Sequence, residues 1–132
     1  MNKQTITING ANFSDLETFY DEIDRVLTKG LNWKTGHNLN AFNDLLYGGF
    51  GVHEYEEPIK LIWIKVNKSK EDLGLEATKN YYKQEIQNPN SLNVQLYKEE
   101  LDKLGNGTGQ TFFDIIIEII SKHDDIEFLM QD

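Results

Sequence analysis

The sequence predicts an α/β protein: one two-layer domain, residues 1–132, in which a three-stranded parallel sheet packs against helices. Residues 5–8, 59–66 and 126–130 have strand character, and helical patterns fill the chain between them. Strands that follow one another through helical connections pair in parallel, with right-handed crossovers. A chain of 132 residues can bury such a core without disulfides.

The first strand and helix follow from local patterns. Residues 5–8 alternate polar and apolar and end at an Asn-Gly turn. A capping box comes next, with Ser14 as the expected N-cap and Glu17 three residues further on. Apolar residues then recur at helical spacing as far as Leu27, and Gly30 supplies a stop.

The stretch 35–51 carries the candidate functional residues. As a short helix, its apolar residues form a core-facing stripe, and four side chains share the opposite face: Asn40, Asn43, Asp44 and Tyr47. Gly48 is the expected stop, so Asp44 falls beside the negative end of the helix dipole, which costs roughly 0.3–1 kcal/mol at an exposed site. This position suggests a role outside folding; a solvated helix end is the alternative.

The second half of the chain continues the alternation. The strand at 59–66 is so rich in β-branched and aromatic residues that we expect both its faces to be covered. Asn67 or Ser69 is expected to cap a short helical turn. Residues 75–104 are polar, with two helical pieces of thin apolar stripe, and this predicts a peripheral, mobile helical flap. The last helix is expected at 110–122.

Composition limits the class of protein. The chain has no cysteine, which excludes disulfides, thiolate metal sites and thiol nucleophiles. A net charge of −9 argues against direct nucleic-acid binding and fits a basic protein partner, with simple solubility as the alternative. The first residues contain no apolar signal core, and apolar runs are too short to span a bilayer, so we expect a cytoplasmic protein without membrane contact.

Catalytic patterns are weak. None of the three histidines has a partner at metal-ligand spacing, and neither HExxH nor Gly-x-Ser-x-Gly occurs. The acidic run 54–57 fits a solvated loop better than an acid–base pair. We therefore expect no enzyme activity, no catalytic residue, no metal and no cofactor.

Residues 36–51 resemble the second helix of the barstar family of intracellular ribonuclease inhibitors. The shared pattern is Gly-x-Asn-Leu-x-Ala-(aromatic or Leu)-x-Asp-x-Leu, followed by a glycine-bearing turn at 48–51. The order of elements over 4–74 and 105–130 agrees, and the resemblance implies that the helical flap at 75–104, which has no counterpart in the short members, is an insertion. The resemblance implies a non-catalytic fold with three parallel strands, whose second helix and adjoining loop block the basic active site of a microbial nuclease.

The resemblance also implies a set of partner-binding residues. It places the family's key aspartate at Asp44, where it mimics a substrate phosphate against Arg and His of the nuclease. Glu118 takes the position of a supporting glutamate on the last helix. The full expected set comprises Asp44, Asn40, Asn43, Tyr47, Trp33, Gly36, Asn38 and Glu118.

Several positions depart from the family pattern. Asn40 replaces a second acid, Asn43 replaces a tryptophan, and Lys122 replaces a glutamate. Lys34 and Thr35 stand where the family has paired tyrosines, with Trp33 close enough to substitute. These differences favour a diverged target over the family's type nuclease.

Two functions remain open. The first is an immunity protein that neutralises a basic nuclease toxin as a monomer in a 1:1 complex. The second is a barstar-like adaptor for a non-nuclease protein, bound through the flap near Tyr81, Tyr82 or Leu96. A catalytic function, the third possibility, requires turnover that is lost on substitution of His37 or Glu118.

Overall fold

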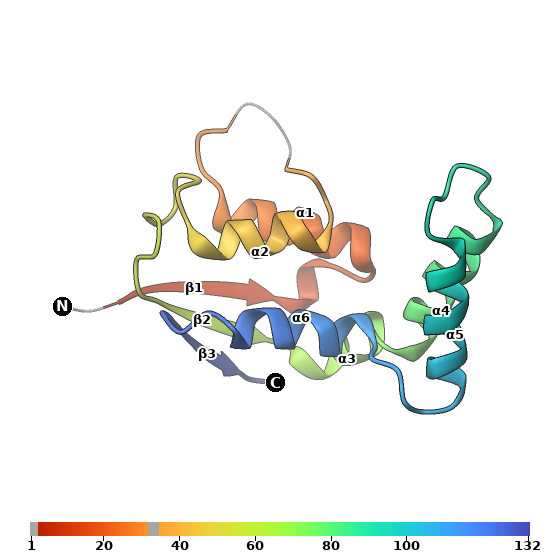
Figure 1. Cartoon of the computed structure of the whole chain (residues 1–132). Coiled ribbons are helices and arrows are strands. Elements are labelled where there is room, and N and C mark those ends of the chain that lie inside the picture. Colours follow the sequence, from red (N-terminus) through yellow and green to blue (C-terminus); the bar gives the residue numbers. More distant parts are fainter. Residues whose placement is uncertain (1–2, 32–34) are drawn as a thin grey trace.

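The structure is a computed structural model that describes residues 3–31 and 35–132. Strands β1 (Gln4–Asn9), β2 (Ile59–Ile64) and β3 (Ile126–Met130) form one parallel sheet in that order. Helices α1 (Leu16–Leu27) and α2 (Leu39–Tyr47) connect β1 to β2, and α6 (Phe112–Ser121) leads into β3 (Figure 1). The predicted two-layer α/β fold is confirmed.

The core lies on one face of the sheet. The register sets Ile8 beside Trp63, and both are buried against α1, α2 and α6. Along β2, buried residues alternate with half-buried ones, among them Ile62 and Ile64. The prediction that both faces of this strand are covered is therefore wrong. Right-handed crossovers that advance in one direction across a sheet place their helices on the same side.

The start of α1 differs from the prediction by one residue. Asp15 is the N-cap: its carboxylate accepts from the Thr18 amide at 2.8 Å, and the Thr18 hydroxyl accepts from the Asp15 amide at 3.1 Å. The predicted box of Ser14 and Glu17 is wrong, because a second capping pair lies one residue along and Glu17 is bonded to His37 instead.

Helix α2 ends at the predicted stop, Gly48, whereas its N-cap was not predicted. Asn38 caps its N-terminus, and Gly48 follows its last residue with φ of 95°. A Cβ at Gly48 would collide with the Glu54 carbonyl, so glycine is required for space as well as for backbone angle. Phe42, Leu45 and Leu46 are buried in the core and form the expected apolar stripe.

Residues 75–104 form two packed helices, α4 (Leu75–Gln87) and α5 (Val94–Gly105), which stand to one side of the sheet (Figure 1). The backbone amide of Phe112 donates to the Thr78 hydroxyl at 2.9 Å, and the Tyr81 ring lies 5.1 Å from that of Phe112. The pair is thus attached to α6 at its base. Its mobility and its status as an insertion stay predictions.

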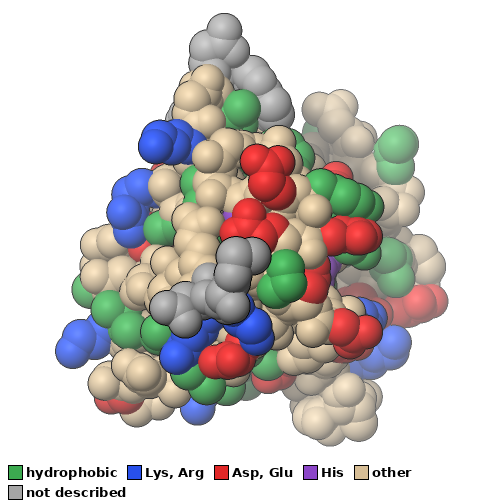
Figure 2. Space-filling view, turned by 90° about the vertical axis from the view of Figure 1, so that its left-hand side faces the viewer, with side chains coloured by type: hydrophobic (Ala, Val, Ile, Leu, Met, Phe, Trp, Pro, Cys, Tyr) green, Lys and Arg blue, Asp and Glu red, His purple; other side chains and the backbone are tan. Residues whose placement is uncertain are grey.

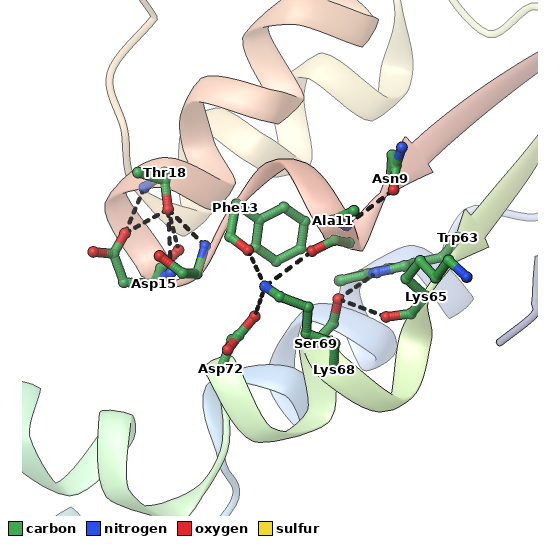
Figure 3. A network of polar contacts seen from close by, with 12 residues as sticks. Asn9, Ala11, Phe13, Asp15, Thr18, Trp63, Lys65, Lys68, Ser69 and Asp72 are labelled. Atoms are coloured by element: carbon green, nitrogen blue, oxygen red, sulfur yellow. Dashed lines mark hydrogen bonds and ion pairs between the residues drawn. The ribbon is translucent and has the colours of Figure 1, made fainter.

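Helix α3 (Val66–Asp72) has no side-chain cap, and Lys65 precedes it in the left-handed conformation. The predicted caps Asn67 and Ser69 are wrong, because both residues lie inside the helix. The Ser69 hydroxyl instead accepts from the buried Trp63 indole at 2.9 Å (Figure 3).

Lys68 of α3 connects this helix to η1 (Gly10–Asn12), the short 3₁₀ turn after β1. Its ammonium group donates to the carbonyl of Gly10 at 3.2 Å and to that of Phe13, and it pairs with Asp72 (Figure 3). These contacts join α3 to the first loop of the chain.

Replacing Ser69 with Ala leaves the Trp63 indole N–H buried without an acceptor. We expect a loss of about 1–3 kcal/mol in the free energy of unfolding, measured with urea. Ser121→Ala, which removes a hydroxyl bonded to a carbonyl at the exposed end of α6, serves as the control and should change stability by less than about 0.5 kcal/mol. Equal losses in the two variants would contradict this role for Ser69.

Candidate functional site

The polar face of α2 lies on the surface. Asn40 and Asp44 are exposed, and Tyr47 is 38% exposed. Burial of the apolar stripe fixes the rotation of the helix, so this face cannot turn inward. The structure therefore brings these three predicted residues together.

Asp44 lies in the last turn of α2. None of the residues at 3–31 and 35–132 forms an ion pair with Asp44 or hydrogen-bonds its carboxylate. The side chains of Asn43 and of the N-cap Asn38, by contrast, each hydrogen-bond other groups of the protein. An acid at a helix C-terminus is repelled by the helix dipole. The carboxylate is thus placed where an external cation would stabilise it.

Asn43 belongs to a different group of contacts. The Nε2 atom of His123 lies 2.7 Å from the Asn43 Oδ1 atom, and the His123 ring meets Tyr47 edge-on at 4.5 Å. The Tyr55 ring stacks on that of Tyr47, with 5.9 Å between the ring centroids. Burial lowers the pKa of His123, so its ring is neutral at neutral pH and donates from Nε2. Asn43 therefore joins α2 to the turn before β3.

Carboxylates border the C-terminal end of α2. A hollow of about 350 Å³ beside Tyr47 is lined by Glu56, Asp124 and Asp125, with Lys122 as its one described cation. Figure 2 views the molecule from the side on which the 48–58 segment lies. Acidic side chains gather on the right half of that view, and basic ones lie mainly along its left and lower edges.

A second acidic group lies at the N-terminal end of α2. His37 contacts three carboxylates of α1: Glu17 at 2.6 Å, Asp24 at 3.0 Å and Asp21 at 3.7 Å. The hydrogen bond to Glu17 is the largest cause of a raised pKa for His37; burial opposes it, and Asp24 adds to it. These contacts hold the segment before α2 on α1.

The other predicted residues are differently placed. The Asn38 side chain is occupied in capping, since its Oδ1 accepts from the Ala41 amide at 2.7 Å and its Nδ2 donates to the Gly36 carbonyl at 2.6 Å. Glu118 accepts from Gln110 at 2.8 Å and pairs with Lys122. No described contact joins Glu118 to α2.

Hydrogen bonding to Gln110, with a further contribution from Lys122, lowers the pKa of Glu118, which therefore stays ionised. Trp33 lies outside the described residues. Among those that are described, no group of three or more metal-ligating side chains occurs, and no helix is long and apolar enough to cross a bilayer.

Sequence reasoning missed the surroundings of α2. The acids of α1 recur at helical spacing, a pattern visible in the sequence, but their shared partner His37 lies in the following loop. Tyr55 and His123 reach Tyr47 from a loop and from the far end of the chain. No local pattern indicates such contacts.

These features define a small two-layer α/β domain with one solvent-facing polar helix edged by carboxylates. The family model described as Barstar (barnase inhibitor) matches residues 3–83, from the start of the sheet into α4. The chain belongs to the barstar family, whose members are inhibitors of ribonuclease. A search of curated proteins found no match.

Because the pKa of His37 is raised, its contribution to the stability of the fold should depend on pH. Such a group stabilises the fold fully below its unfolded pKa, about 6.5, and this contribution is lost as the pH rises through the folded-state pKa. His37→Gln, which cannot be protonated, should therefore lose more stability at about pH 5.5 than at about pH 8.5 in urea unfolding. The same loss at both pH values would contradict the charged interaction.

Proposed function

We propose that this chain is a cytoplasmic immunity protein that inhibits a basic microbial ribonuclease toxin. The polar face of α2 and its adjoining loop would cover the active site of the nuclease in a 1:1 complex. One observation carries the proposal: Asp44, which the resemblance places at the position of the family's key aspartate, is exposed and has no cationic partner among the described residues. A nuclease active site that binds phosphate supplies such a partner.

The distribution of charge supports a basic target. Acids of α1 lie at one end of α2, and Glu56, Asp124 and Asp125 lie at the other. The whole chain carries a net charge of −9. A surface of this kind speeds association with a basic protein through long-range attraction, which salt weakens.

The polar residues of α2 favour a diverged target. Asn40 is neutral and exposed, and Asn43 is bonded to His123. Asp44 therefore supplies the only carboxylate of the helix itself. The flanking acids provide negative charge that would otherwise come from α2.

Replacement of Asp44 with Ala tests this function. Wild type and variant are titrated into barnase-like and related toxin ribonucleases while RNA cleavage is followed. Removing one member of a hydrogen-bonded interface charge pair costs about 2–5 kcal/mol, a range to which barnase and barstar themselves contributed, so we expect Kd to rise at least about 30-fold.

Glu71→Ala is the matched control, because it removes one charge from the exposed surface of α3 and should leave inhibition unchanged. Inhibition by wild type should also weaken as salt increases. Equal inhibition by wild type and Asp44→Ala would exclude Asp44 as the anchor. Failure to inhibit any ribonuclease of the panel would count against the inhibitor function.

One observation favours the second candidate, a barstar-like adaptor for a non-nuclease protein. The α4–α5 pair exposes several apolar side chains, among them Tyr81, Leu92 and Leu96. Binding through this pair would be insensitive to Asp44→Ala and sensitive to substitution at Leu96.

A further inference from the structure

A cleft separates α1 and the start of α2 from the α4–α5 pair. Its volume is about 500 Å³, within the range of ligand-binding pockets. Asn40 of α2 and its N-cap Asn38 lie on one side, and Tyr81, Tyr82 and Tyr97 lie on the other. The cleft is therefore continuous with the polar face of α2.

Aromatic rings form the wall on the α4–α5 side. The centroid of the Tyr81 ring lies 5.8 Å from that of Tyr82 and 6.2 Å from that of Tyr97, at interplanar angles of 66° and 87°. The ring meets Phe112 at 5.1 Å and 76°. Tyr81 is 36% exposed and Tyr97 is half-buried, so both rings reach the surface of the cleft, and an aromatic face attracts a cation.

Glu17 supplies the one carboxylate among the described residues that line the cleft, and a carboxylate can only accept hydrogen bonds. Tyr20 lines the cleft beside Glu17, and its hydroxyl can accept a hydrogen bond from a ligand as well as donate one. Burial raises the pKa of Tyr20 and raises that of Tyr81 to about 12, so both phenols are neutral at neutral pH. One oxygen of Glu17 bonds His37, and the other has no partner in the described parts of the chain.

Charge favours a cationic occupant. No lysine or arginine is among the described residues that line the cleft. Protonated His37 does not reverse this, because three carboxylates of α1 surround its ring. The α1 side of the cleft therefore stays negative.

We propose that this cleft binds the guanidinium group of an arginine side chain from the protein partner. A planar guanidinium stacks on aromatic faces and donates in its plane to oxygens such as those of Glu17 and Tyr20. An aliphatic side chain leaves both oxygens unmatched. The identity of the partner as a basic nuclease rests on the proposed function, whereas the chemistry of the cleft does not. The α4–α5 pair then provides a second contact beside α2.

Binding of a small arginine analogue tests this directly, using the full chain and no nuclease. N-acetyl-argininamide is titrated while the ring resonances of Tyr81, Tyr82 and Tyr97 are followed by NMR. N-acetyl-norleucinamide, a neutral analogue of similar length, is the control ligand. We expect saturable shifts in the millimolar range with the arginine analogue only.

Two variants separate charge at the cleft from charge elsewhere. Glu17→Gln should weaken binding of the arginine analogue several-fold, and Glu99→Gln, on the exposed surface of α5 and outside the cleft, should not. Absence of shifts, equal shifts with norleucinamide, or equal effects of the two variants would overturn the proposal. Because the assay contains no nuclease, its failure is distinct from a failure of inhibition through Asp44.

Discussion

Phe19 is the point at which the two layers of the molecule meet. Its fully buried ring stacks on Trp63 of the sheet at 5.6 Å and meets Phe42 of α2 edge-on at the same distance. Through these contacts α1 and β2 fix the rotation of α2. The exposed position of Asp44 depends on that rotation, so core packing and the candidate binding surface follow from one arrangement of rings.

Charge is arranged around α2 rather than along it. The helix carries one carboxylate, while acids from α1 and from the segments that precede β2 and β3 flank its ends. An acidic surface built from several elements can keep its attraction for a basic partner while individual contacts change. Such a surface keeps negative charge around α2 although the resemblance places Asn40 where the family has a second acid.

Local patterns predicted much of the fold. The end of α2 was predicted, because Gly48 acts within a few residues, and β3 was predicted at its observed bounds, whereas the capping role of Asn38 was not predicted. The predicted N-cap of α1 was one residue too early, because Ser14 with Glu17 and Asp15 with Thr18 both fit the capping-box pattern. Contacts between distant segments, such as that of Asn43 with His123, carry no local signal. The aromatic cleft was missed for the same reason, as its walls come from segments far apart in the chain.

If the polar face of α2 binds the nuclease, it should be shielded from solvent in the complex. Amide hydrogen exchange, measured on the chain alone and in complex with a ribonuclease that it inhibits, detects such shielding. We expect slower exchange in the complex over residues 36–51 and unchanged exchange in α3 and β3. Protection confined to other parts of the chain, with exchange in α2 unchanged, would contradict it.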